Sequence, residues 1–186
     1  MKFVKIDKIH QGQFITRYDA LYETKSGEKK VYELISRDPD IKTHEDLNSS
    51  KIDSVVLILR DENDERILLN KEYRMATGEW VYNFPAGLID EGETIETAAE
   101  RELREETGLH LDSIEYIWHE SYSAIGFSNE KNACIEGRAS GTIKPSDSEL
   151  EEIEAAWYTK KELAELLKTC HFAARTQAYC VLWARS

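Results

Sequence analysis

Cysteine, basic residues and long apolar runs are all scarce in this sequence. Its three cysteines, which show no CxxC spacing, predict reduced thiols rather than a disulfide framework. No apolar run approaches the length of a membrane span, and the opening MKFVKIDKIHQGQF alternates and is charged, unlike a signal peptide. We therefore expect a cytoplasmic protein without a membrane segment.

The shortage of basic residues leaves an excess of negative charge. Lys and Arg number 24 against 36 Asp and Glu, which gives a formal net charge of −12. Such a surface argues against binding to nucleic acid or to an anionic membrane. A phosphate-bearing substrate remains compatible with it, provided that bound metal ions reverse the sign of the local charge.

The chain of 186 residues suits one domain, or one domain with a small appended lobe. Polar residues 38–52 lack periodicity and are interpreted as a linker. The predicted strands are 2–9, 13–23, 29–37, 53–60, 65–74, 111–122, 131–139 and 152–158. The predicted helices are 94–107, stopped by Gly108, then 160–168, which a Thr159–Glu162 capping box begins, and 172–184. Strands mixed with a few helices predict an α/β or α+β sandwich.

The helix predicted at 94–107 places carboxylates on its apolar side. At 100° per residue, Glu102 and Glu106 fall on the stripe of Ile95 and Ala98, and Glu105 lies at its edge. Buried carboxylates that repel one another need a positive partner. No nearby Lys or Arg lies on this stripe, so a hard divalent cation is the natural partner.

Two alternatives to a metal site stay open for this helix. Arg101 could hold a neighbouring glutamate by a bidentate pair. The helix could also be a charged surface helix with pairs at a spacing of four residues. The stripe alone therefore does not identify an enzyme.

The same segment carries a longer pattern of fixed residues. In order, these are Gly87, Glu93, Arg101-Glu102-Leu103, Glu105-Glu106 and Gly108-Leu109. The pattern resembles, at every fixed position, the signature of the Nudix hydrolases. The resemblance implies an α/β/α sandwich with a mixed sheet. It also implies hydrolysis of a nucleoside diphosphate linked to another group.

The resemblance further implies a metal centre of Mg²⁺, or of Mn²⁺. Its ligands would be Glu102, Glu105, Glu106 and the backbone carbonyl of Ala86, and the three glutamates would form the core of the catalytic site. Bound ions would neutralise the diphosphate and lower the pKa of a water that attacks one phosphorus in line. The products would be a nucleoside monophosphate and a phosphorylated second group.

Four residues of the pattern would have structural roles. In relatives the arginine that matches Arg101 orients a glutamate, here Glu93. Gly87 and Gly108 would serve the backbone, at a turn and at a helix end.

Outside the signature, the chain resembles the ADP-ribose pyrophosphatase branch of this family. KEYR (71–74) and NFPAG (83–87) resemble that branch's QYR and EIPAG, and SAIGFSNE (123–130) resembles its SPGFSDE loop. Two positions depart from the branch, because Ile125 replaces its proline and Asn83 a common glutamate. By this resemblance, residues 1–48 would be an N-terminal antiparallel sheet used for dimerisation and base binding, and 49–186 the hydrolase domain.

The branch also implies substrate contacts at specific positions. Tyr32 would stack on the base, Arg37 would contact the ligand and Arg74 would lie near the phosphates, with Gly126 and Glu130 in the loop. Each has a plainer interpretation as a packed strand aromatic or a surface charge.

In this branch the general base comes from an acidic loop after the later strands. SDSELEEIE (146–154) fits, with Glu149 and Glu151 as first candidates and Glu152 and Glu130 as further ones. A solvated acidic loop is the alternative.

We thus expect a homodimeric, metal-dependent hydrolase of a nucleoside diphosphate sugar, with ADP-ribose or an ADP-sugar first in order. A house-cleaning nucleoside triphosphate pyrophosphatase and a non-catalytic nucleotide-sugar sensor of the same fold are the alternatives. The long N-terminal sheet counts against the first, and the complete set of glutamates against the second.

Overall fold

The chain packs as two compact units in a computed structural model that describes residues 1–148 and 150–186. The first unit contains Met1–Asp53 and Glu120–Asn132, and the second contains Ser54–His119 and Ala133–Ser186. The first unit therefore includes the lobe predicted at 1–48 together with a later segment of the chain. Within the described residues, no helix has the length and apolar character needed to cross a lipid bilayer.

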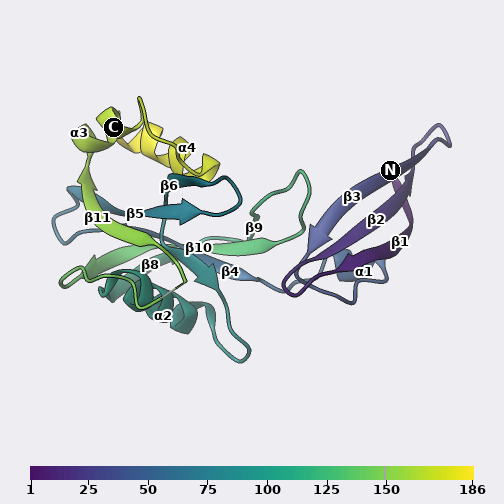
Figure 1. The fold of residues 1–186 in the computed structure, drawn as a ribbon, viewed down its shortest axis with the longest axis horizontal. Coiled ribbons are helices and arrows are strands. Elements are labelled where there is room, and N and C mark those ends of the chain that lie inside the picture. The colour runs from purple at the N-terminus through teal and green to yellow at the C-terminus, as the bar shows by residue number, and fades with distance from the viewer. Residues whose placement is uncertain (149) are drawn as a thin grey trace. The chain divides into compact units, whose positions relative to one another are not determined.

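The first unit is built on an antiparallel sheet with the spatial order β1-β2-β3 (Figure 1). Its strands are β1 Lys2–Gln11, β2 Thr16–Glu23 and β3 Lys29–Ser36. Tyr18 and Ala20 are fully buried in its small core. The predicted linker is not wholly irregular, because Thr43 and Asp46 form a capping box for the short helix α1 His44–Leu47.

The later segment of the first unit adds a short strand and a loop. Strand β9 Ser121–Tyr122 pairs with the first two residues of β10 Lys131–Ser140. The loop that follows β9 reaches β3, where the backbone N of Ile35 donates to the carbonyl of Phe127 at 2.8 Å. The single strand predicted at 111–122 is therefore wrong, since the chain forms β8 His110–Ile117 and then β9.

An eight-stranded sheet with the path β11-β5-β4-β10-β8 supports the second unit. Strand β6 pairs with β5, and β7 pairs with β4. Its other strands are β4 Ser54–Arg60, β5 Arg66–Arg74, β6 Glu79–Asn83, β7 Ala86–Leu88 and β11 Ile153–Thr159. The helices are α2 Ile95–Thr107, α3 Lys160–Leu166 and α4 Ala174–Trp183. Strands β6 and β7 lie in a stretch where the sequence predicted none.

Side-chain alternation along the central strands gives the sheet two apolar faces. The core on the α2 side contains Val55, Leu57, Leu59, Leu68, Ala98, Ala99, Leu103, Leu109, Ile135 and Ala139. The core on the side of α3 and α4 contains Val56, Ile67, Leu69, Tyr82, Phe84, Leu163 and Cys180. Helices thus pack on both faces of the sheet (Figure 1), and the predicted α/β/α sandwich with a mixed sheet is confirmed.

Candidate active site

Helix α2 begins and ends at residues suited to those positions. The Thr94 side chain accepts a hydrogen bond from the backbone N of Thr97 at 3.2 Å, and the Thr97 side chain accepts one from the N of Thr94 at 2.9 Å. At the other end Gly108 has φ of 73°, a left-handed conformation, and its N–H donates to the carbonyl of Arg104 at 2.8 Å. These two caps set where α2 begins and ends.

Glu106 is a buried carboxylate on α2, with 7% of its surface exposed. Nδ2 of Asn70 on β5 donates to its Oε2 at 2.9 Å, and the backbone N of Ala86 donates to the same oxygen at 3.3 Å. Burial, followed by the negative charges of Glu102 and Glu72, raises the pKa of Glu106 well above its ordinary value. The two donors do not offset the loss of solvent, so a cation bound here would lower that pKa.

Glu102 lies directly over the backbone of Gly87 on β7. A Cβ atom on Gly87 would lie 1.9 Å from Cδ of Glu102, so only glycine leaves room for the carboxylate. Burial raises the pKa of Glu102 although Arg101, at 2.8 Å, acts to lower it, and the charges of Glu105 and Glu151 raise it further. Gly87 was predicted to serve a turn, but it lies inside strand β7, where the absence of a side chain leaves room for the carboxylate of Glu102.

The guanidinium of Arg101 lies at the centre of an ion-pair network. Its Nε and Nη2 each donate at 2.8 Å to a different oxygen of Glu93, and this bidentate pair lowers the pKa of Glu93 to about 2. Nη1 donates to Glu102 at 2.8 Å and to Glu105 at 3.3 Å. Nη2 also donates to the carbonyl of Leu88 at 2.8 Å. Arg101 therefore holds a neighbouring glutamate by a bidentate pair, as one of the alternatives for this helix predicted, and it also places positive charge beside Glu102 and Glu105.

The predicted metal ligands line one region without forming a closed cage. Across residues 1–148 and 150–186, no three His, Cys, Asp or Glu side chains gather closely enough to enclose an ion. Glu105 has a half-exposed side chain that is bonded to Arg101 and to Arg104. Glu102, Glu106 and the backbone of Ala86 lie together at the contact between α2 and β7, through the contacts described above.

The candidates for the general base and for the phosphate-binding arginine lie in the loop before β11 and at the end of β5. Glu149 lies outside the described residues. Glu151 is exposed before β11, and its charge is one of those that raise the pKa of Glu102. Arg74 ends β5 with its Nη1 3.5 Å from Oε2 of Glu72.

The first unit brings together the other predicted substrate residues. The hydroxyl of Tyr32 on β3 donates to the carbonyl of Gly126. Just after β3, Nε of Arg37 donates to Oε2 of Glu130 at 2.6 Å, while the Ser123 hydroxyl donates to Oε1 of Glu130 at 2.9 Å. The 123–130 loop is therefore tied to the N-terminal sheet at both of the positions that the sequence singled out.

Two polar residues near the carboxylates were missed. Asn70 and Glu72 on β5 are 1% and 8% exposed, and Asn70 touches Glu106 directly. A signal was present in the sequence, because two polar residues spaced by two follow an apolar run in a predicted strand, ILLNKE. Side chains at that spacing share a face of the sheet.

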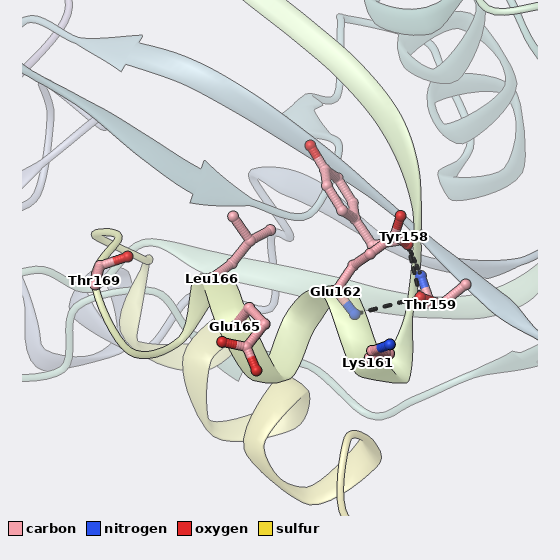
Figure 2. A pocket seen from close by; sticks show the side chains of 7 residues that line it. All are labelled: Tyr158, Thr159, Lys161, Glu162, Glu165, Leu166 and Thr169. Atoms are coloured by element: carbon pink, nitrogen blue, oxygen red, sulfur yellow. Dashed lines mark hydrogen bonds between the residues drawn. The ribbon is translucent and has the colours of Figure 1, made fainter.

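A pocket of about 630 Å³ lies elsewhere, between β11 and α3 (Figure 2). Its carboxylates are engaged locally, since Glu162 accepts from the backbone and hydroxyl of Thr159 at the helix N-terminus and Glu165 pairs with Lys168. This pocket is on the face of the sheet opposite to α2. Its groups stabilise a helix end, so we do not regard it as the reaction site.

Comparison with known proteins agrees with this geometry. The NUDIX domain family model matches residues 51–179, which include all of α2, the strands that support it and the glycine beneath Glu102. The chain therefore belongs to the Nudix family.

Several characterised relatives are similar over part of their length. An NAD-capped RNA hydrolase NudC of Vibrio atlanticus is 34% identical over 110 residues, which cover 59% of this chain and 39% of that protein. An oxidized purine nucleoside triphosphate hydrolase of Mus musculus is 31% identical over 60% of this chain and 68% of its own. An ADP-sugar pyrophosphatase of Mus musculus is 29% identical over 54% of this chain and 44% of its own. The chain thus spans about a third to two thirds of these relatives.

A solved structure described as an ADP compounds hydrolase has the same fold. It aligns with a TM-score of 0.69 and 19% identity, and covers 100% of this chain and 93% of the other. At that identity the likeness shows the fold alone.

Proposed function

We propose that this chain is a divalent-metal-dependent pyrophosphohydrolase that splits the diphosphate of a nucleoside diphosphate sugar. ADP-ribose or an ADP-sugar is the first candidate. One observation carries the proposal, namely the two carboxylates Glu102 and Glu106 on the inner side of α2, both with raised pKa values and one seated on a glycine. Such raised pKa values mark groups that a bound cation would stabilise in their charged form.

The residues present suit a hard divalent cation. Glutamate carboxylates and a backbone carbonyl are the oxygen ligands that Mg²⁺ and Mn²⁺ take. Two N–H donors reach the same oxygen of Glu106, Oε2, which fixes the side chain in place. Glu102, Glu105, Glu106 and the Ala86 carbonyl would hold the ion or ions. When bound, the metal would neutralise the diphosphate and lower the pKa of a coordinated water.

The chain's own residues would orient and activate the reactants. Arg101 makes four hydrogen bonds of 2.8 Å, two to Glu93, one to Glu102 and one to the carbonyl of Leu88. These bonds hold the two glutamates in position and attach the loop before α2 to the helix. Glu151 or Glu149 in the loop before β11 would take the proton of the attacking water. Arg74 would contact a phosphate oxygen, since a guanidinium matches phosphate geometry.

Support for a nucleotide-sugar substrate comes from the first unit and from the relatives. Tyr32 on β3 and Arg37 just after it are bonded to Gly126 and Glu130 of the 123–130 loop, so an aromatic ring and a positive charge lie beside the same loop. Those are the groups that stack on a base and pair with an anion. The ADP-sugar pyrophosphatase among the relatives is consistent with this substrate. Because another relative is a nucleoside triphosphate hydrolase, the test below also includes triphosphates.

A substrate panel tests the proposed reaction. The purified chain, with Mg²⁺ or Mn²⁺, is given ADP-ribose, other ADP-sugars, dinucleotides and nucleoside triphosphates, and monophosphate release is measured. We expect kcat/KM to be highest for ADP-ribose or an ADP-sugar and turnover to stop with EDTA. Preference for a triphosphate would favour the alternative enzyme, and binding of ADP-ribose without turnover would favour a sensor.

Replacement of Arg37 by alanine should act on substrate binding more than on turnover. Loss of a charged contact to the ligand costs about 1.5–3 kcal/mol, so KM should rise at least about tenfold while kcat changes less than about threefold. Arg17→Ala is the matched control, because Arg17 is an exposed arginine of the same sheet that pairs with Asp19 and Glu33. Equal kinetic constants for the two variants would remove Arg37 from the substrate site.

We also propose a cytoplasmic homodimer whose interface includes the first unit. Phe14 and Ile15, in the turn between β1 and β2, and Val31 on β3 expose 72%, 46% and 57% of their surfaces, which is apolar surface that a second copy could cover. Sedimentation should give about twice the 21.5 kDa mass of the chain. A monomer that still hydrolyses ADP-ribose normally would contradict the dimer.

A further inference from the structure

One face of β5 leads from the apolar core to the carboxylates of α2. Residues two apart on a strand share a face, so Leu68, Asn70 and Glu72 point to the same side of the sheet. Leu68 packs in the core that contains the apolar side of α2, and Asn70 donates to Glu106 at 2.9 Å. Glu72 is the next residue on this face and is 8% exposed. Its carboxylate is therefore buried on the side of the sheet that holds Glu106.

A hydrogen-bonded chain from α4 fixes the orientation of Glu72. The backbone N of Phe84 donates to Oγ1 of Thr176 at 3.3 Å, and this hydroxyl donates to Oδ1 of Asn83 at 2.9 Å. Nδ2 of Asn83 then donates to Oε1 of Glu72 at 3.0 Å. Because an ionised carboxylate can only accept, the Nδ2 of Asn83 must face Glu72, and its Oδ1 then faces the Thr176 hydroxyl, which donates to it. The side chains of this relay, Asn83 and Thr176, are themselves buried.

The negative charge of Glu72 is poorly balanced by protein groups. Within residues 1–148 and 150–186, the cation that pairs with Glu72 is Arg74, whose Nη1 is 3.5 Å from Oε2 and whose side chain is 57% exposed, so solvent screens it. A buried carboxylate without close compensation is unfavourable. On the same face of β5, Oδ1 of Asn70 is buried and has no hydrogen-bond partner among the described residues.

We propose that Glu72 is a further carboxylate of the cation site, acting from β5 on the water shell of the ion that Glu102 and Glu106 hold. Asn83 and Thr176 are its positioning residues. The inference rests on the proposed metal-dependent function. Mg²⁺ dehydrates reluctantly and keeps several waters, which need acceptors around them. Groups just outside a metal's ligands commonly change its affinity by 10–100-fold.

The test measures cation binding, with no substrate present. Mn²⁺ is titrated into the full chain, and free Mn²⁺ is followed by its electron paramagnetic resonance signal. Glu72→Gln keeps the shape and the Asn83 bond but removes the charge, and its Kd should rise about 10–100-fold. Glu154→Gln is the matched control, because Glu154 lies opposite Lys71 on β11 and pairs with that lysine on the other face of the sheet. Its Kd should stay within about twofold of the wild type.

A double variant that moves the carboxylate to the other side of one hydrogen bond separates the effect of its charge from an effect on folding. In the double variant Glu72→Gln/Asn83→Asp, the carboxylate moves to the other end of the same bond, where the Thr176 hydroxyl still donates to it. Mn²⁺ affinity should return to within about fivefold of the wild type. A purely structural role for Glu72 would give no such recovery. Thr176→Val, which removes the donor to Asn83 but leaves Glu72, should weaken binding to an intermediate extent and serves if Glu72→Gln does not fold.

The outcomes distinguish this inference from the function on which it rests. If Glu72→Gln binds Mn²⁺ as tightly as the wild type while Glu106→Gln does not, the role of Glu72 is overturned and the proposed function stands. If the wild type neither binds Mn²⁺ nor hydrolyses any substrate of the panel, both fail together.

Discussion

Replacement of Glu106 by glutamine is expected to lower kcat by at least about a hundredfold while leaving the fold intact. Glutamine has the same shape, and its single carbonyl oxygen can accept both of the bonds that now reach Oε2, from Asn70 and from Ala86. The buried N–H donors of Asn70 and Ala86 therefore both keep a hydrogen-bond acceptor in the variant. What the variant loses is the negative charge that would hold a divalent ion, and hence the electrostatic part of catalysis.

The stability of Glu106→Gln should change in the opposite direction from its activity. The folded-state pKa of Glu106 is raised, so the folded chain keeps a proton at pH values where the unfolded chain has lost it. The free energy of unfolding therefore falls as pH rises from the unfolded pKa, about 4.3, through the raised folded pKa. A neutral glutamine does not titrate, so the free energy of unfolding of the variant does not fall in this way as the pH rises. At pH 8 without divalent ions, the Tm of the variant should equal or exceed that of the wild type.

Addition of Mg²⁺ or Mn²⁺ should reverse that order. A ligand that binds only the folded state raises the Tm of the protein that binds it, here the wild type, and leaves Glu106→Gln nearly unchanged. Differential scanning fluorimetry with and without metal, beside steady-state hydrolysis of ADP-ribose, measures both effects. Near-normal turnover in the variant, or equal Tm gains with metal, would contradict the assignment of Glu106 as a ligand.

Helix periodicity predicted most of α2 and the burial of Glu106, for physical reasons that are local. Predicted at 94–107, the helix spans Ile95–Thr107 and ends at a left-handed Gly108. Caps and one-sided burial are properties of neighbouring residues, which a sequence displays directly. The placement of Glu106 on the buried side follows from the same 100° rotation that buries Ala98 and Ala99.

Contacts between distant segments could not be predicted in the same way. Asn70 meets Glu106 because β5 and α2 pack together, and Asn83 meets Glu72 because β6 pairs with β5 in one particular register. Strand pairing is decided by the whole sheet.

Gly87→Ala is expected to lower kcat by about 10–100-fold with only a small change in Tm. The backbone of Gly87 lies in a strand without a positive φ, so alanine adopts it without strain. Its Cβ would lie 1.9 Å from Cδ and 2.1 Å from Oε1 of Glu102, a contact that no protein tolerates. Because that carboxylate is the free end of a flexible side chain, it swings aside and the fold survives. Displacement of a metal ligand is what costs activity.

Gly137→Ala is the matched control, because there the added Cβ would meet backbone and not a side chain. There a Cβ would lie 2.2 Å from the backbone carbonyl oxygen of Ser113, across the β10–β8 pair, and a backbone cannot swing aside. That variant should lose several degrees of Tm, whereas kcat per folded molecule should stay close to the wild-type value. Gly87→Ala should show the reverse, together with a Kd for Mn²⁺ at least about tenfold weaker. A Gly87→Ala protein with normal kcat and normal Mn²⁺ affinity would mean that the position of Glu102 over this glycine has no part in the reaction.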